Sequence, residues 1–107
     1  MQHMIALVVE IVRFVEATQP GVVECSMTDA WDRNHAFIHK VPIFTTEDLT
    51  ESSSYPQRGV IECGVLRRWR DSEGREIATI DTSNPSHVES TEGQTQFDVS
   101  ASELTGL

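Results

Sequence analysis

The stretch GVVECSMTDAW, Gly21 to Trp31, is nearly repeated as GVIECGVLRRW, Gly59 to Trp69. At a fixed offset of 38 residues, Gly, Val, Glu, Cys and Trp coincide at five of eleven positions, where unrelated sequences of average composition would share about one. Each copy is followed by a polar turn and then by a second strand-like run. The pattern therefore predicts a β-hairpin that occurs twice, over residues 21–41 and 59–81.

Apolar and polar residues alternate in both copies, as is typical of a half-buried antiparallel strand. The apolar phase holds Cys25 in the first copy, with Trp31 after it, and Cys63 and Val65 in the second, with Trp69 after them. We therefore expect both thiols in the core, where burial raises the thiol pKa and suppresses nucleophilic chemistry. Whether the two cysteines are bonded to each other stays open.

The rest of the chain adds one strand at each side of the two hairpins. Residues 4–16 are rich in β-branched side chains, which favours a strand, although charges at helical spacing leave an amphipathic helix as the alternative. Residues 45–58 are acidic and rich in Ser and Thr, which indicates a surface excursion, and residues 96–101 alternate as a last strand. The sum is a single all-β domain over residues 1–107: a six-stranded antiparallel barrel or small sandwich built from two related hairpins.

The charge balance excludes two classes of partner. The chain has 17 acidic and 8 basic residues, a net charge of −9. Nucleic-acid backbones and anionic membrane surfaces repel such a molecule. The first apolar run is broken by Glu10 and Arg13 and lacks a basic start, so we expect neither a secretion signal nor a membrane span, and a cytoplasmic location.

Turn and strand motifs spread over the chain carry a family resemblance. They are QPG-x-VEC at 19–25, KVPIF at 40–44, YPQ-x-GVI at 55–61 and ESTEG at 89–93. Together they resemble a family of small bacterial proteins of about a hundred residues, the size of one domain. The resemblance implies a stand-alone bacterial domain; it brings no established activity and no catalytic residue.

The clearest candidate site is a cluster of arginines around a tryptophan. Around Trp69 lie Arg67, Arg68, Arg70 and Arg75. On a nucleic-acid binder such a cluster would contact phosphates and bases. The net charge argues against that class, so the functional interpretation is a surface for an anionic protein or small anion. The plainer interpretation is a solvated strand that balances the chain's own carboxylates. The candidate binding residues are Trp31, Arg67, Arg68, Trp69, Arg70 and His87.

Two further pairs of residues have a chemical interpretation. Asp29 and Arg67 occupy the same position in the two copies and fall in the inward phase, so we expect an ion pair or an exit to solvent. His35 and His39 project from one face of a strand about 13 Å apart, too far to share a metal. No spacing indicates a catalytic group, a metal site or a cofactor.

These observations favour a non-enzymatic bacterial protein that binds another protein, in an immunity-type or accessory role. The expectation rests on small size, acidity and the lack of a catalytic constellation. The alternative is a small barrel that binds or transforms a small molecule between its loops, lined by Trp31, Trp69, His35 and His87. The sequence leaves open the identity of the partner and whether the protein forms a homodimer.

Overall fold

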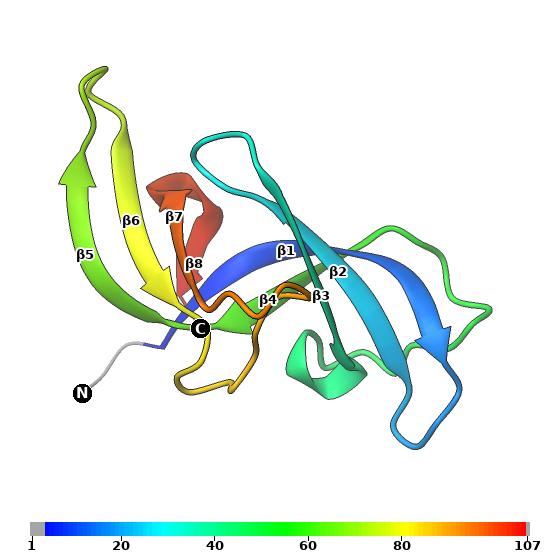
Figure 1. Ribbon diagram of the computed structural model, residues 1–107. Helices are drawn as coiled ribbons and strands as arrows, with labels where there is room; N and C mark the ends of the chain where they lie inside the picture. Colours follow the sequence, from blue (N-terminus) through cyan, green and yellow to red (C-terminus); the bar gives the residue numbers. More distant parts are fainter. Residues whose placement is uncertain (1–3, 107) are drawn as a thin grey trace.

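The computed structural model describes residues 4–106 and contains only strands and two short 3₁₀ helices. This confirms the all-β prediction. No helix in this part of the chain has the length and apolar character needed to cross a membrane. The elements, shown in Figure 1, are β1 (Ile5–Glu16), β2 (Val22–Thr28), β3 (Asn34–Lys40), η1 (Val41–Ile43), β4 (Gln57–Glu62), β5 (Gly64–Arg70), β6 (Glu76–Asp81), β7 (Gln96–Ser100), η2 (Ala101–Glu103) and β8 (Leu104–Gly106).

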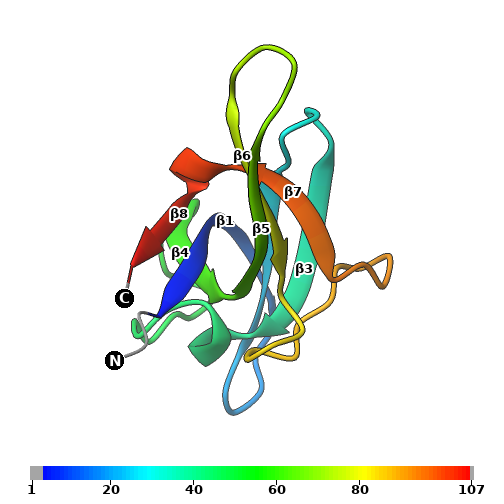
Figure 2. The same cartoon turned by 90° about the vertical axis from the view of Figure 1, so that its left-hand side faces the viewer.

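The strands form two antiparallel sheets that pack on a common core. The larger sheet has the order β3-β2-β1-β4, with β8 beside β1, and the smaller has the order β5-β6-β7. The described strands do not close into a barrel, so the sandwich alternative is the one that fits. The β5–β6 hairpin projects from the body at the same end as the turn between β2 and β3 (Figures 1 and 2).

Strand β1 organises the larger sheet because three strands pair with it. β4 pairs with residues 6–11 on one edge, whereas β8 pairs with residues 5–7 and β2 with residues 10–16 on the other. Leu7, Val9 and Ile11 are buried in strand alternation. The strand interpretation of residues 4–16 is therefore confirmed, and their amphipathic-helix alternative is wrong.

Both cysteines lie in the core, as the apolar phase predicts. Cys25 is fully buried and Cys63 nearly so, and both are free thiols. Both sheets supply side chains to this core, which buries the surface that each sheet could not bury alone. Its largest buried side chains from the two sheets include Leu7, Ile11, Val23, Phe37, Ile61, Ile80, Phe97 and Val99.

The two copies of the repeated stretch are used differently. The first forms one strand, β2, and pairs with β3 as predicted over residues 21–41. The second divides at Cys63 into β4, in the larger sheet, and β5, in the smaller, so its hairpin is β5–β6 alone. This division, together with β8, gives eight strands within the described residues, where the sequence pattern indicates six.

No strand forms between η1 and β4, where the sequence predicts a surface excursion. Leu49 is buried and anchors this segment to the core. The hydroxyl of Tyr55 donates a 2.7 Å hydrogen bond to the carbonyl oxygen of Thr50, which closes the segment on itself. The excursion, predicted over residues 45–58, thus ends two residues earlier, at residue 56, since β4 begins at Gln57.

Candidate functional site

Trp31 and Trp69 meet at the surface, although they come from different sheets. Trp31 lies in the turn after β2, and Trp69 lies on β5. Their ring centroids are 6.1 Å apart and their planes are tilted by 38°. Trp31 is 43% exposed and Trp69 is half-buried, so the pair presents an open aromatic surface within the distance range of favourable ring pairs.

An arginine covers each end of this pair. The Cζ atom of Arg67 lies 5.0 Å from the ring centroid of Trp69, and that of Arg75 lies 5.5 Å from the centroid of Trp31. Both distances are within the range of cation–π attraction, worth about 0.5–1 kcal/mol at exposed sites. We call these four residues, Trp31, Arg67, Trp69 and Arg75, the Trp–Arg face.

A short chain of hydrogen bonds beneath the rings holds both indoles. Trp69 Nε1 donates to Thr79 Oγ1 (3.1 Å), and Thr79 Oγ1 donates to Asp98 Oδ1 (2.6 Å). Trp31 Nε1 donates to the other carboxylate oxygen of Asp98 (3.3 Å). Each indole N–H therefore has an acceptor, and the two rings are tied to the same carboxylate.

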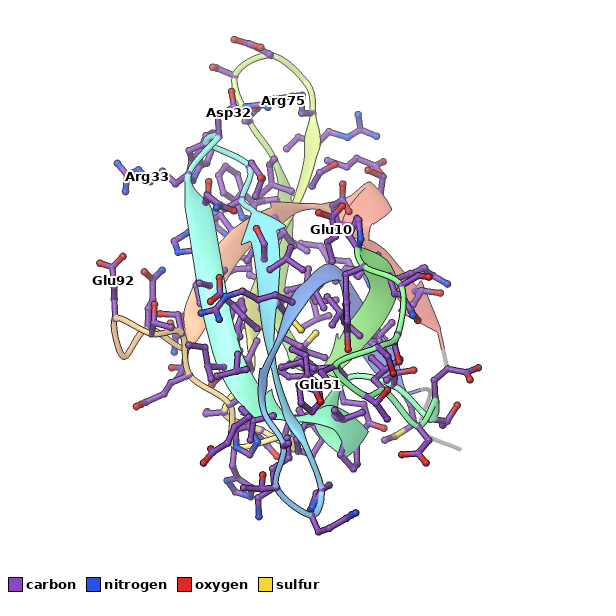
Figure 3. All side chains as sticks on the ribbon, turned by 90° about the vertical axis from the view of Figure 1, so that its right-hand side faces the viewer. Glu10, Asp32, Arg33, Glu51, Arg75 and Glu92 are labelled. Atoms are coloured by element: carbon purple, nitrogen blue, oxygen red, sulfur yellow. The ribbon has the colours of Figure 1, made fainter. Side chains whose placement is uncertain are left out.

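The backbone joins the two hairpins at the same place. The N–H of Ala30 donates to the carbonyl oxygen of Asp98 on β7 (2.9 Å). The Nη1 group of Arg75 donates to the carbonyl oxygen of Ala30 (3.3 Å). Figure 3 shows Asp32 and Arg75 side by side at this end of the molecule, and the Asp32 charge contributes to the raised pKa of Arg75. The turn between β2 and β3 is thereby fixed against the smaller sheet.

Arg75 and Arg67 differ in how firmly they are held. Arg75 Nε donates to Asp71 Oδ2 at 2.7 Å, and this hydrogen bond is the main reason that the pKa of Arg75 is raised. Arg67 and Arg68 form no salt bridge with a carboxylate anywhere in residues 4–106. These two guanidinium groups are available to a ligand from outside.

A β-bulge places Arg67 and Trp69 on the outer face of the smaller sheet. Val65 pairs with Ile80, but Arg67 pairs with Thr79, so the register shifts by one residue at Leu66. Directly paired residues of antiparallel strands share a face. The expectation that Val65 and Trp69 share one face is therefore wrong: Val65 packs against the core and Trp69 faces away from it.

Of the two outcomes expected for Asp29 and Arg67, an ion pair or an exit to solvent, the ion pair does not form and Arg67 is exposed to solvent. Arg67 stays exposed over Trp69, whereas Asp29 Oδ2 accepts a 2.7 Å hydrogen bond from His35 Nε2. The prediction assumed an inward phase for both residues, and the register shift at Leu66 ends that phase before Arg67. Both side chains of the actual pair are nearly buried, at 7% and 11% exposure.

Asp29 closes the turn that carries Trp31. Its Oδ1 atom accepts hydrogen bonds from the backbone N–H groups of Trp31 (2.8 Å) and Arg33 (3.0 Å). Burial by itself raises the pKa of Asp29, but the hydrogen bonds from His35, Arg33 and Trp31 outweigh it and hold the pKa below its usual value. The His35 ring in turn packs edge-on against Phe97, 4.9 Å between centroids.

The same turn occurs twice more in the chain. Asp71 and Ser90, like Asp29, accept hydrogen bonds at the side chain from the N–H groups two and four residues on. In each case the residue three positions on has positive φ: Asp32 (61°), Gly74 (80°) and Gly93 (81°). This is the three-residue hairpin loop in which a type I turn is followed by a left-handed residue.

Of the remaining predicted site residues, Arg68 and Arg70 lie close to the Trp–Arg face and His87 lies apart from it. Arg70 pairs with Glu76 (2.9 Å), and with exposed Arg68 it borders a hollow of about 320 Å³ beside Trp69. His87 belongs elsewhere: it lines a hollow of about 640 Å³ with His39 and Ile38, against the β3 edge. The structure therefore groups Trp31 with Trp69 and Arg67, and leaves His87 out.

Sequence reasoning placed Arg75 in the arginine cluster but missed Thr79 and Asp98 as parts of the site. Arg67 in the apolar phase of β5 was the available signal, because a charged residue there indicates a change of phase. Residues 4–106 contain no group of three or more metal-binding side chains. Burial, above all, raises the pKa of Cys25 to about 12 and that of Cys63 to about 11, so neither thiol ionises at neutral pH.

No protein-family model, curated protein or solved structure matches this chain. The resemblance to a family of small bacterial proteins stays an expectation. The geometry of the Trp–Arg face is what supports a function.

Proposed function

We propose that this chain is a non-enzymatic module that binds another protein through the Trp–Arg face. The observation that carries the proposal is the contact between the exposed Trp31 and the half-buried Trp69, with a guanidinium group over each ring. Tryptophan and arginine are the residues most enriched among those that dominate binding energy in protein interfaces. The Trp–Arg face has two residues of each kind in one contiguous patch, as the central region of a protein–protein interface often does.

The rigidity of the face supports the same function. Binding loses free energy whenever side chains must be ordered, about 0.5–1.5 kcal/mol for each flexible side chain. Here the indole of Trp69 is already fixed by Thr79 and that of Trp31 by Asp98. A partner that packs on the two rings therefore does not have to order these side chains, because folding has already fixed them.

The arrangement favours a protein over a small molecule as the ligand. Trp69 and His87, both expected to line one small-molecule site, border different hollows. His35 points instead at Asp29, and its ring packs on Phe97. Nucleic acid is disfavoured by the net charge of −9.

Photo-crosslinking tests the proposal because Ile38 offers a control position with the same exposure, 43%, as Trp31. A benzophenone amino acid replaces either Trp31 or Ile38, and each protein is irradiated in extract of the source cells. We expect a discrete crosslinked protein at position 31 that is absent at position 38 and is competed away by unmodified protein. Equal product patterns at both positions would count against the Trp–Arg face.

A point variant gives a second measurement on the same face. Arg67→Ala removes a guanidinium that has no salt bridge among the described residues and loses one cation–π contact with Trp69, so we expect the fold to be kept with a loss of stability of about 1 kcal/mol or less. The captured partner should bind Arg67→Ala more weakly, by about tenfold or more, which is the loss that defines a dominant interface residue. Unaltered affinity would show that the partner contacts another surface.

A further inference from the structure

We propose that the partner supplies an acidic, extended segment that adds as a fourth strand along the free edge of β5. The inference rests on the proposed function and specifies its partner. It follows from three observations: no strand of residues 4–106 pairs with the outer edge of β5, the outward backbone groups of β5 can be identified, and its side chains present a defined chemical pattern.

Strand β5 has a different edge from β3, β4 and β7; the three-residue strand β8, which pairs with β1, is the other outer strand. The N–H of Thr91 donates to the carbonyl oxygen of Ala36 on β3, and Ala30 N–H donates to Asp98 on β7. On β4, the N–H of Val60 donates to the carbonyl oxygen of Phe44. Within residues 4–106, β5 pairs with β6 only, and it forms the outer margin of the smaller sheet in Figure 1. An exposed edge of this kind is a template for an added strand.

The hairpin turn shows which backbone groups of β5 point outward. Asp71 N–H donates to the carbonyl oxygen of Arg75, so these two residues form a hydrogen-bonded pair. Hydrogen-bonded and non-hydrogen-bonded pairs alternate along antiparallel strands. The next pair, Arg70 with Glu76, and the pair of Arg68 with Ala78 are therefore non-hydrogen-bonded. The N–H and C=O groups of Arg68 and Arg70 face away from β6.

The side chains of β5 divide by face into two kinds. Trp69 and Arg67 lie on the outer face, where Trp31 adds a second ring. Arg68 and Arg70 lie on the opposite face. Arg70 forms an exposed salt bridge to Glu76 and donates a 3.2 Å hydrogen bond to the carbonyl oxygen of Gly74. Both side chains of the salt bridge are about two-thirds exposed, and such pairs exchange partners at little cost. An added strand would complement both faces if its carboxylates lay beside Arg68 and Arg70 and its apolar side chains lay beside Trp69.

The same charges disfavour a second copy of the chain as the occupant. An antiparallel pairing of two β5 strands centred on Arg67 or Arg68 places that arginine opposite its own copy, and directly opposed like charges destabilise a sheet. No acidic residue occurs in β5 to offset them. Charge complementarity therefore selects an acidic partner strand.

The test uses a synthetic peptide with the length of β5, seven residues, in which Glu alternates with Val. The control peptide carries Lys in place of Glu. Amide hydrogen exchange is followed by NMR with each peptide. With the acidic peptide we expect the amides of Arg68 and Arg70 to exchange at least about tenfold more slowly. A tenfold slower exchange corresponds to about 1.4 kcal/mol of protection. No protection should occur with the lysine peptide.

A pair of variants separates the backbone contact from the charge. Arg68→Ala removes the guanidinium, whereas Arg68→Pro also removes the outward N–H without touching a bond to β6. We expect Arg68→Pro to bind the acidic peptide about tenfold more weakly than Arg68→Ala, from the loss of one backbone hydrogen bond. Equal affinity of the two variants would overturn strand addition, and the exchange data on the unmodified protein decide the matter if Arg68→Pro does not fold.

The outcomes distinguish this inference from the proposed function. Crosslinking at position 31 without protection of the amides of Arg68 and Arg70 would overturn the strand-addition inference and leave the Trp–Arg face as the binding site. Protection of these amides without crosslinking at position 31 would overturn the Trp–Arg face as the binding site and leave strand addition at β5. A concentration-dependent dimer in light scattering, with the same amides protected and no peptide present, would overturn the acidic strand in favour of a second copy.

Discussion

Trp31 and Trp69, 38 residues apart in the chain, share the carboxylate of Asp98 through one direct hydrogen bond and one that passes through Thr79. The two rings are thus fixed relative to each other by buried or half-buried polar groups and not by ring contact alone. Because one tryptophan comes from the β2–β3 turn and the other from β5, the relationship also fastens the two sheets together.

Thr79→Val removes the hydroxyl that links the two indoles while keeping the shape of the side chain. Trp69 Nε1 loses its acceptor and Asp98 loses a donor, so we expect the free energy of unfolding to fall by about 1–2 kcal/mol. Urea unfolding followed by circular dichroism measures it. Thr28→Val, at an exposed threonine of β2, is the matched control and should change stability by less than about 0.5 kcal/mol.

Asp29→Asn should make stability less dependent on acid pH. The pKa of Asp29 is held below its usual 3.8 in the folded state, so its ionised form stabilises the fold fully above that value, and this contribution is lost as pH falls through the folded pKa. At pH 7 we expect the variant to be about 2 kcal/mol less stable. The difference should shrink steadily below pH 4 in unfolding curves measured across that range, and a difference independent of pH would contradict it.

Much of the fold follows from local pattern in the sequence. The β-branched side chains of residues 4–16 predict a strand there, and the alternation of apolar and polar residues predicts the first strand of each repeat copy and the last strand, near residues 96–100. The return strands, at 34–40 and 76–81, follow from the polar turns that precede them. The phase of Cys25 and Cys63 likewise predicts their burial. These features depend on side chains within a single strand, and the alternation of residues along a strand shows which of its side chains share a face.

The site could not be predicted to the same depth because it depends on register. One extra residue at Leu66 turns Arg67 and Trp69 to the other face of the sheet, and no alternation within β5 reports which residue is the extra one. Asp98 and Thr79 join the site only through cross-strand pairing and a turn from the other sheet. The division of the second copy at Cys63 had a weak signal in Gly64, a residue that often marks a bend in a strand.

Gly74→Ala and Gly93→Ala should each destabilise the fold without any steric clash. Both glycines have φ near +80°, and a Cβ atom would meet nothing within 4 Å at either one. The cost is that of a left-handed backbone with a side chain, about 1 kcal/mol each. Gly64→Ala is the control: its φ is not positive and its Cβ would make an ordinary 3.6 Å contact, so thermal unfolding should show a much smaller change.

The two thiols should be unreactive in the folded protein. Burial, the largest cause, raises the pKa of Cys25 to about 12 and of Cys63 to about 11, and the thiolate is the reactive form. With Ellman's reagent at pH 8, labelling should be slow in buffer and complete within the mixing time in denaturant. Rapid labelling of either cysteine under native conditions would show that the core opens without unfolding.

A double-mutant cycle on Trp31 and Trp69 tests the central claim most directly, that the two hairpins are joined into one rigid face. Urea unfolding is measured for the parent, Trp31→Ala, Trp69→Ala and the double variant, with Ile38→Ala in place of Trp31→Ala as the control cycle. We expect a coupling of about 1 kcal/mol between the two tryptophans and none between Ile38 and Trp69. Additive losses for the two tryptophans would show that they do not act together and would contradict the account.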